Sequence, residues 1–342
     1  MKIIHLNAAS GLFALALIVL PFAAFPDSHV PADTSETGMP PPEPAPERDI
    51  VIGGGAVAGV YFPAAGAICR VLSMQETNRR CLVESNVNSS VNLERLANGL
   101  LDFAVVQSDW LMHASRGTSL FRPNGPDETL RAVLSLHAEA LTLVTRAGAG
   151  IETPEDLEGK RVNLGPAYTY QRVLTETLLR AAGLDEDDLA LVTEMSVEEQ
   201  FTALCTGELD AAAIVAAHPT PVLVDAMQRC DLRLIAIAGK RIDALLKDRT
   251  ELAPAVVPGG LYTGAPDDVE TFGLRAVLAT TTQVEDEIVR ALVEAVLGEF
   301  STFAAQHPAL GRLDRKAMAR AGIAVPLHPG AENAFKTHGF LP

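Results

Sequence analysis

Two stretches of this chain run through the same order of elements. Residues 96–109 (LANGLLDFAVVQSD) and 204–217 (LCTGELDAAAIVAA) each lead from the end of an expected helix, through a turn with Gly and Asp, into an apolar strand. The surrounding sequence alternates short apolar strands with helical stretches, which is typical of α/β proteins with mostly parallel sheets. The repetition predicts two lobes, each a mostly parallel sheet flanked by helices. It also predicts a ligand cleft between them, because open α/β sheets bind ligands outside the carboxyl ends of their strands.

This plan predicts element and domain ranges. We expect helices over 60–74, 90–98, 170–182, 197–205 and 288–303, and strands over 49–54, 80–85 and 102–109. Segments expected to line the cleft are 53–61, 85–92, 107–110, 165–171 and 216–221. Lobe 1 is expected over 49–138, lobe 2 over 139–240 and a return to lobe 1 over 241–342, with hinges near 137–140 and Gly239.

The composition favours a globular protein that does not bind nucleic acid. Apolar residues make up 48% of the 342 residues and charged residues 20%, whereas disordered chains show the opposite balance. A formal net charge of −16 argues against nucleic acid or an anionic membrane surface as a partner. This charge is still compatible with a small anionic ligand, because a pocket sets its own local field.

The N-terminal region is expected to direct export. Residues 1–32 resemble a signal peptide, with Lys2 before an apolar run over 11–20 and a small-residue cleavage pattern at 30–32. The apolar run is short for a membrane span. Residues 33–48 are rich in Pro and Glu, which predicts a disordered tether. Because the first cysteine is Cys69, no lipid-modified N-terminal cysteine is expected, and the mature protein should be soluble in the periplasm.

The chain has four cysteines, which an exported protein is expected to pair. Four cysteines allow three connectivities, and the sequence alone does not choose among them. Local pairing, Cys69 with Cys81 and Cys205 with Cys230, is favoured if each pair lies within one lobe. The alternative is four buried thiols.

A glycine-rich stretch over 51–66 (VIGGGAVAGVYFPAAG) has the strand, turn and helix order of a dinucleotide site. Gly53, Gly55 and Ala58 match a relaxed G-x-G-x-x-A pattern, and Glu84 ends the next expected strand. The match is weak, since such short patterns arise easily in a chain rich in Ala and Gly. Alternatively, the glycines let backbone N–H groups approach an anion near the positive end of the following helix.

Six motifs occur in a fixed order over 49–341: GGGAVAGVYFPAAGAICR, VESNVNSSVNLERLANGLLDFAVVQSDW, DLEGKRVNLGP, AAHPTP, VVPGGLYTGAPDDVETFG and VPLHPGAE. Together they resemble the TAXI group of extracytoplasmic solute receptors, which serve tripartite ATP-independent periplasmic (TRAP) transporters. The resemblance implies a type II-like periplasmic-binding-protein fold. It also implies a receptor that closes on a small carboxylate solute and delivers it to a membrane permease of the TRAP type. We expect a monomer without a cofactor.

The resemblance also implies ligand-binding residues in the first lobe. Tyr61 matches the family tyrosine after the glycine turn, where its hydroxyl can donate to a carboxylate; otherwise it is a capping aromatic. Ser89 and Asn92 match the Ser and Asn of the family pattern G-S-x-x-N-L, although an N-cap serine explains Ser89 equally well. Gln107 and Ser108 end a buried strand at the expected cleft, and Asp109 beside them is alternatively a helix cap.

The second lobe departs from the family pattern G-x-P-G-S-G-[TQ]. Tyr168 and Tyr170 replace two glycines, which removes an amide concavity and adds hydroxyl groups and rings. The site residues expected in this lobe are Tyr168, Thr169, Tyr170, Gln171 and His218. Arg172 is a further candidate for contact with an anion, and His328 is expected to be structural.

Two other classes of function are weighed against the receptor. The chain contains no G-x-S-x-G elbow, H-E-x-x-H motif or phosphate loop, and its histidines lack the spacing of zinc ligands. No catalytic or metal-binding residue is therefore expected, and an exported enzyme is the less favoured alternative. A periplasmic sensor that feeds a membrane kinase would use the same solute-binding physics and differ only in its partner.

Overall fold

The computed structural model describes residues 48–57, 59–75, 79–86, 88–167 and 169–342. Within these ranges the chain forms one mixed sheet in the order β2-β1-β3-β10-β4-β7-β5-β6, with β8 paired to β4 and β9 paired to β10. The strands are β1 (Ile50–Gly53), β2 (Cys81–Glu84), β3 (Phe103–Gln107), β4 (Leu130–Arg146), β5 (Arg161–Asn163), β6 (Leu191–Thr193), β7 (Ala211–Ala216), β8 (Leu232–Ile235), β9 (Ala253–Val257) and β10 (Val269–Thr281).

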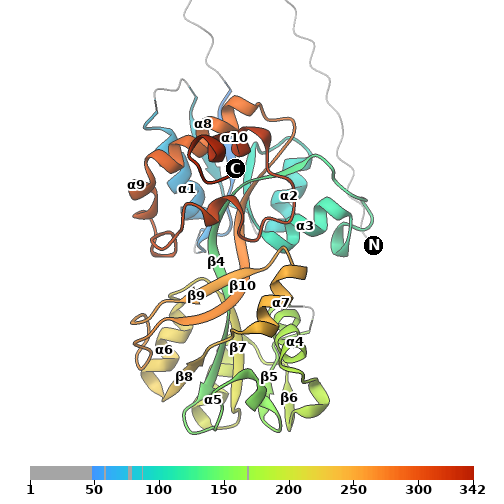
Figure 1. Ribbon diagram of the computed structural model, residues 1–342, viewed down its shortest axis with the longest axis vertical. Helices are drawn as coiled ribbons and strands as arrows, with labels where there is room; N and C mark the ends of the chain where they lie inside the picture. Colours follow the sequence, from blue (N-terminus) through green and yellow to red (C-terminus); the bar gives the residue numbers. More distant parts are fainter. Residues whose placement is uncertain (1–47, 58, 76–78, 87, 168) are drawn as a thin grey trace, which may run out of the picture. The chain divides into compact units, whose positions relative to one another are not determined.

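Helices cover both faces of this sheet (Figure 1). The α-helices are α1 (Tyr61–Leu72), α2 (Ser89–Ala97), α3 (Ser108–Arg116), α4 (Tyr170–Ala182), α5 (Val197–Thr206), α6 (Pro221–Arg229), α7 (Lys240–Asp248), α8 (Asp286–Gly298), α9 (Phe300–Ala304) and α10 (Pro329–Thr337). Five 3-10 turns complete the described ranges: η1 (Ser119–Phe121), η2 (Pro154–Leu157), η3 (Glu186–Asp188), η4 (Pro308–Leu310) and η5 (Ala317–Ala319).

The parallel part of the sheet consists of two three-stranded units, as the repeat predicts. Strand β1 pairs in parallel with β2 and β3, and β5 pairs in parallel with β6 and β7. Each parallel neighbour is reached through a helix, because a parallel connection has to return the chain to the same edge of the sheet. The carboxyl ends of β1 and β3 therefore share one edge, and those of β5 and β7 share another.

Two long strands join these units and run antiparallel to their neighbours. β10 pairs with β3, β4 and β9, and β4 pairs with β10, β7 and β8. Figure 1 shows β4 and β10 running between the elements around α1, α2 and α3 and the elements around α4, α5 and α6. The sheet is therefore mixed and continuous, with its parallel character confined to the two units beyond the crossing strands.

Four hydrophobic clusters form the core. Two of them lie on the elements around α1, α2, α3, α8 and α10, which we call lobe 1. The other two lie on the elements around α4, α5, α6, α7 and β9, which we call lobe 2. Helix α1 shows the pattern that builds such a core, because Ala64, Ala65, Ile68, Val71 and Leu72 are buried at helical spacing.

The second passage between the lobes differs from its predicted position. The hinge expected near Gly239 is wrong, because α7, which follows Gly239 directly, packs Ile242 into the core of lobe 2. The chain reaches lobe 1 later, within β10. The contacts do not divide the described part of the chain into separate units, so the predicted domain ranges stay predictions.

Three local differences from the expected elements have physical causes. The helix expected over 288–303 is interrupted, since α8 ends at Gly298 and α9 begins at Phe300. The two apolar runs before and after 137–139 form the single strand β4. The N-cap of α2 is Asn88, whose side chain accepts from the Val91 N–H at 3.0 Å, so that Ser89 is the first helical residue and not the cap.

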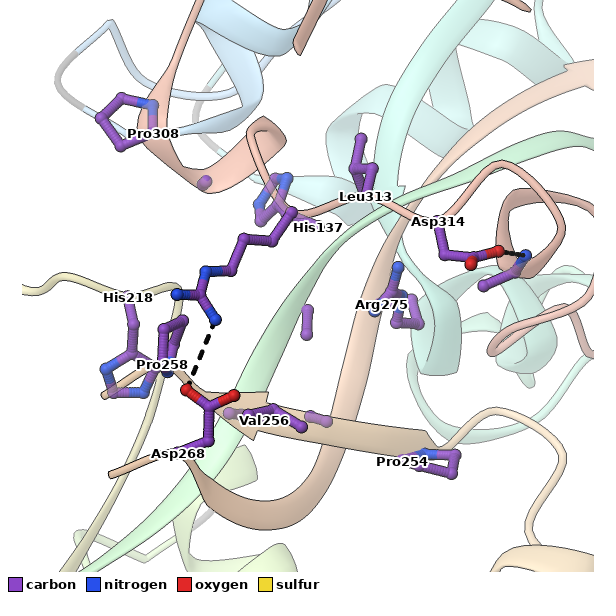
Figure 2. Close-up of a pocket in the computed structure, with 16 residues that line it drawn as sticks. His137, His218, Pro254, Val256, Pro258, Asp268, Arg275, Pro308, Leu313 and Asp314 are labelled. Carbon is purple, nitrogen blue, oxygen red and sulfur yellow. Dashed lines mark hydrogen bonds and ion pairs between the residues drawn. The ribbon is translucent and has the colours of Figure 1, made fainter. Parts of the chain in front are cut away.

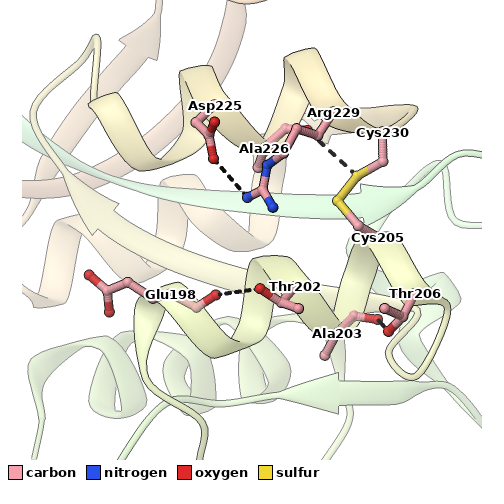
Figure 3. The surroundings of a disulfide bond; sticks show 9 residues. All are labelled: Glu198, Thr202, Ala203, Cys205, Thr206, Asp225, Ala226, Arg229 and Cys230. Atoms are coloured by element: carbon pink, nitrogen blue, oxygen red, sulfur yellow. Dashed lines mark hydrogen bonds and ion pairs between the residues drawn. A yellow bond between two sulfur atoms is a disulfide. The ribbon is translucent and has the colours of Figure 1, made fainter.

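Both favoured disulfides are confirmed within the described ranges. Cys69 in α1 is bonded to Cys81 in β2, and Cys205 in α5 is bonded to Cys230 at the end of α6 (Figure 3). Each bridge therefore ties a helix to a neighbouring element of the same lobe. The expected signal peptide and tether, apart from Arg48, lie outside the described residues. No helix in the described ranges is both long and apolar enough to cross a bilayer.

Candidate functional site

The glycine turn after β1 is held against lobe 1 by Asn92. The Asn92 side chain is fully buried, donates to the carbonyl oxygens of Gly54 at 2.9 Å and Val105 at 3.1 Å, and accepts from Asn86. A Cβ atom at Gly53 would lie 2.7 Å from the Asn92 amide oxygen, and one at Gly54 would lie 2.9 Å from the Cα of Phe62. Close packing thus accounts for these glycines, and both amide hydrogens of Asn92 are used inside the protein.

The two serines predicted as ligand contacts also bond within the protein. Ser89 is buried and its hydroxyl accepts from the Gln107 N–H at 3.1 Å. The Ser108 hydroxyl, 1% exposed, donates to the Glu251 carbonyl at 2.7 Å and accepts from the Arg275 N–H at 3.1 Å. Ser89 therefore fixes the end of β3, and Ser108 joins the start of α3 to lobe 2.

Ionisable side chains and tyrosines from both lobes meet where β4 and β10 pass between them. Lobe 1 contributes the end of β3 and the starts of α1 and α3, β4 contributes its central residues, and lobe 2 contributes the start of α4 and the segment before β9. We call this set the inter-lobe cluster: Tyr61, Gln107, Asp109, Glu139, Tyr170, Arg249 and Glu251.

The contacts inside the inter-lobe cluster are mostly electrostatic. Gln107 donates to the Glu139 carboxylate, and Arg249 forms an ion pair with Glu251. Burial raises the pKa of the Tyr61 hydroxyl, and the nearby Glu139 carboxylate raises that pKa further. The pKa of the Tyr170 hydroxyl is raised by burial, then by Asp109 and Glu251. The cluster is therefore a buried site that holds three carboxyl groups and one guanidinium group.

Burial raises the pKa values of two carboxyl groups of the cluster, Asp109 and Glu139, above their usual range. The pKa of Asp109 is raised to about 7, first by burial, with further raising by Glu139 and Glu251. The pKa of Glu139 is raised by burial, which the hydrogen bond from Gln107 opposes. Carboxyl groups whose pKa is raised in this way are common at functional sites, because structure alone gains nothing from a buried charge.

Several buried polar atoms of this region have no hydrogen-bond partner in the described part of the chain. They include the hydroxyl oxygens of Tyr61 and Tyr170, one carboxylate oxygen of Asp109 and both ring nitrogens of His137. The His137 ring, in β4, meets the Tyr61 ring edge to face with centroids 5.6 Å apart, and His137 also lines the cavity described below. Because most buried polar atoms in proteins are satisfied, such a group of exceptions is typical of a ligand site.

The other predicted residues of lobe 2 have mixed roles. Thr169 is the N-cap of α4 and accepts from the Arg172 N–H at 3.3 Å. Gln171 is buried and donates to Gln200 at 3.2 Å. Tyr168 lies outside the described residues. Among the site residues predicted for lobe 2 that the structure describes, only Tyr170 belongs to the inter-lobe cluster.

His218 lies instead at a cavity of about 430 Å³ between the lobes (Figure 2). Its two ring nitrogens bond to the Thr142 hydroxyl at 2.8 Å and the Tyr262 hydroxyl at 2.6 Å, and burial lowers the pKa of its imidazole to about 4. Arg312 and Asp268 also line this cavity and form an ion pair at 3.4 Å. His218 therefore shapes the wall of this cavity as a neutral side chain.

Arg275 lines the same cavity and stabilises an irregularity in β4. The pairing of β10 with β4 shifts between Arg275 and Val277, and the Arg275 guanidinium donates to the Ser135 hydroxyl and the Leu136 carbonyl at that point. Arg275 pairs with Ala138, whereas the next pair contains Glu139. Side chains alternate along a strand, so the cavity residue Arg275 and the cluster residue Glu139 leave β10 and β4 on opposite faces.

Sequence reasoning did not propose Glu139, Arg249 and Glu251, which belong to the inter-lobe cluster, or His137, which contacts Tyr61, as candidate site residues. A usable signal existed for two of them, because His137 and Glu139 are ionisable residues in the middle of a strand that is otherwise largely buried. Arg172 is not a free anion ligand, since it forms ion pairs with Glu176, Glu186 and Glu194. His328 is structural as expected: it is buried and caps α10.

The fold defines the class of protein to which the chain is similar. It resembles a TctC solute binding protein from Polaromonas, with a TM-score of 0.55 and 16% sequence identity over 78% of this chain and 88% of that chain. The periplasmic aliphatic sulphonate binding protein SsuA from Escherichia coli gives a TM-score of 0.48 and 15% identity over 87% of this chain and 84% of that chain. The likeness to the TctC protein shows a shared fold, the two-lobed architecture of solute-binding proteins. By sequence, the chain belongs to the NMT1-like family, whose profile matches residues 52–339.

Proposed function

We propose that the protein is an extracytoplasmic receptor that closes around a small solute between its lobes and delivers it to a membrane permease of the TRAP type. The family and the two-lobed fold support the receptor, and the motifs shared with TAXI receptors support this kind of permease. The observation that carries the proposal is the set of unpartnered buried polar atoms that lobe 1 and lobe 2 both direct to the inter-lobe cluster. A solute bound to both lobes stabilises the closed form by its difference in affinity for the two states.

We further propose that the solute carries a carboxylate, bound at the start of α1. The N-cap of this helix, Val60, makes no side-chain hydrogen bond to the first turn, so the N–H groups of Tyr61 and Phe62 are available to an anion. The Tyr61 hydroxyl is buried beside the Glu139 carboxylate, and among the described residues it makes no hydrogen bond of good geometry, so it adds a donor on the same residue. A helix N-terminus without a side-chain cap, beside a tyrosine hydroxyl, suits a carboxylate group.

Native mass spectrometry of the protein purified from a periplasmic extract tests this function. The expected result is a small carboxylate that dissociates unchanged on denaturation. The fluorescence of Trp110, which follows Asp109 in α3, then measures its affinity. If the solute is chemically converted during incubation, the protein is an enzyme. If the purified protein contains no solute and its Trp110 fluorescence responds to no carboxylate, the proposal is contradicted.

Tyr61→Phe tests the carboxylate contact by removing one hydroxyl. Hydrogen bonds to charged groups contribute about 1.5–3 kcal/mol, so we expect affinity to fall by roughly tenfold or more. Tyr262→Phe is the matched control, because the Tyr262 hydroxyl already bonds to His218 and to the Thr220 N–H. This control should lower stability but leave affinity within about twofold. Equal affinity in Tyr61→Phe and the wild type would remove Tyr61 from the site.

A further inference from the structure

We propose that the cavity beside His218 is a second ligand site of the protein, which binds a small organic phosphate. The cavity lies on the opposite face of β4 and β10 from the inter-lobe cluster, because Arg275 and Glu139 leave these strands on opposite faces. The phosphate is a different ligand from the proposed solute, so the inference goes beyond the receptor function and does not depend on it.

A bulge in β4 directs two neighbouring residues into this cavity. Strand β4 advances three residues from Ser135 to Ala138, whereas β10 advances only two over the same stretch. The extra residue breaks the alternation of side chains, so that His137 and Ala138 both line the cavity (Figure 2). His137 is 2% exposed, and neither of its ring nitrogens has a hydrogen-bond partner among the described residues. A buried ring with two unused nitrogens in a cavity wall indicates a missing occupant.

Arg275 brings a positive charge without a counter-charge to the same cavity. Its guanidinium donates to the Ser135 hydroxyl and the Leu136 carbonyl, which are neutral groups, and it forms no ion pair in the described part of the chain. Burial lowers the pKa of Arg275 to about 10, so the side chain still carries its charge at neutral pH. Removing a cation from water without a counter-charge is costly, and a bound anion offsets this cost.

The two acidic residues at this cavity already have partners. Asp268 pairs with Arg312 and also accepts from a backbone N–H. Asp314 accepts from two backbone N–H groups of the turn that follows it. Both acidic residues are exposed, so water screens their charges. They therefore leave the Arg275 side of the cavity open to an anion.

A basic segment of lobe 1 favours an anion with two charges. Residues 312–320 contain four basic residues and one acid, in a chain whose formal net charge is −16. Lys316 and Arg320 of this segment form no ion pair among the described residues, and they line a second cavity that shares two lining residues with the first. A doubly charged phosphate group also offers several oxygen atoms as acceptors to the guanidinium of Arg275.

The other walls of the cavity suit an apolar body on the phosphate. Pro254, Val256, Pro258 and Leu313 line the cavity, whose volume is about 430 Å³. Pockets of this size hold small organic molecules. A phosphate monoester with one short apolar substituent therefore fits both the charge and the walls.

Four related probes test this site: phenyl phosphate, benzenesulfonate, phenol and inorganic phosphate. Each is titrated by calorimetry against the wild-type protein at pH 8, where a phosphate monoester carries two charges. We expect phenyl phosphate to bind about tenfold more tightly than each of the other three, because only phenyl phosphate combines the double charge with an apolar body. Affinity for phenyl phosphate no higher than for another probe, or no binding of it at millimolar concentration, would overturn the phosphate site.

Variants assign the binding to this cavity. His137→Phe removes both ring nitrogens and should weaken phenyl phosphate about tenfold, while Lys316→Gln removes one charge and should weaken it about threefold. Lys336→Gln is the matched control for Lys316, because Lys336 pairs within α10 and lines neither cavity. Tyr170→Phe changes the inter-lobe cluster instead and should leave the affinity for phenyl phosphate within about twofold. A loss in Tyr170→Phe with none in His137→Phe would place the probe in the cluster and overturn the second site.

Arg275→Gln tests the charge directly, but it also removes the bonds that hold the bulge of β4. Circular dichroism and thermal melting show whether this variant folds. In the folded variant, the affinity for phenyl phosphate should fall about tenfold or more, and unchanged affinity would overturn the site. If the variant does not fold, His137→Phe decides, because it leaves the bonds of Arg275 in place. If native mass spectrometry finds no solute but phenyl phosphate binds as described, the receptor function fails and the phosphate site stands.

Discussion

At the scale of single residues, His137 is the clearest example of a group held in an unfavourable state. Burial lowers the pKa of its imidazole to about 3, and nearby Arg275 and His307 add to the effect. The folded protein therefore keeps His137 neutral at a pH where the unfolded chain binds a proton. The stability that this residue supports is complete above about pH 6.5 and is lost as the pH falls toward 3.

Replacing His137 by Phe should remove this pH dependence. Each pH unit below about 6.5 should cost the wild type roughly 1 kcal/mol of unfolding free energy relative to His137→Phe, which has no proton to bind and keeps a ring against Tyr61. Urea denaturation between pH 7 and pH 4 measures the difference. The exposed residue His338 provides the control, since His338→Gln should keep the wild-type slope. Parallel slopes for wild type and His137→Phe would contradict the prediction.

Residue roles could be predicted from sequence only where position along a strand decides them. Gln107 and Tyr61 follow buried strands, and the structure brings both to the inter-lobe cluster. Asn92 was expected to contact the ligand, but its amide instead bonds to the carbonyls of Gly54 and Val105, a contact that exists only after folding. The part played by Glu251 depends on how α7 packs against lobe 2, which no local pattern indicates.

At the scale of elements, the disulfides act within lobes. The Cys205–Cys230 bridge closes a segment with a sequence separation of 25 residues and holds α5 beside α6 (Figure 3). Residues between the two cysteines include β7 and the turn that bears His218. The bridge therefore constrains the lobe 2 strand next to β4 without touching the inter-lobe cluster.

Replacing Cys205 and Cys230 together by Ser should lower the unfolding free energy by about 3 kcal/mol, because the unfolded chain regains the entropy of the open loop. Solute affinity should change by less than about twofold, since neither cysteine lies in the cluster. Thermal melting and calorimetry measure the two quantities. The Cys69→Ser and Cys81→Ser pair gives a companion value in lobe 1, where the separation is 12 residues. An affinity loss of tenfold or more would show coupling between the bridge and the site.

Element boundaries were predictable where caps and turns are local. The helix expected over 170–182 coincides with α4, whose N-cap is Thr169 and whose C-cap is Gly183 with a φ of 83°. The strand β4 was not predicted as one element, because the polar residues at 137 and 139 divide the apolar pattern. Its continuity is imposed by pairing with β10 on one side and with β7 further along, which is a tertiary effect.

At the scale of the whole molecule, one ion pair spans the cavity between the lobes. Arg312 follows η4 in lobe 1, and Asp268 precedes β10 on the side of lobe 2 (Figure 2). Their side chains are 62% and 60% exposed, so water and salt screen the attraction, and the pair contributes less than about 1 kcal/mol. The pair therefore adds little to the contacts between the lobes.

Arg312→Gln should therefore shift the protein toward an open form by a small amount. We expect the solute affinity to fall about twofold at low salt, with little difference from the wild type near 0.5 M salt, where exposed pairs are screened. Arg312 is the better residue to replace, because Asp268 also accepts from the Gly259 N–H. Arg290→Gln removes a similar exposed pair within α8 and serves as the control. Small-angle scattering with and without solute measures the shift toward the open form. A tenfold loss of solute affinity in Arg312→Gln that persists at high salt would contradict this prediction.

The crossing of β4 and β10 has a mechanical consequence. Gly273 approaches β4 so closely that a Cβ atom there would lie 2.1 Å from the Glu139 carbonyl oxygen. The backbone that links the two halves is thus the same backbone that carries the Glu139 carboxylate of the inter-lobe cluster. Any change in the curvature of these strands moves that carboxylate, and a bound molecule that fixes the carboxylate resists the change of curvature. By thermodynamic reciprocity, a substitution that stiffens the strands would alter affinity even though it touches no atom of the bound molecule.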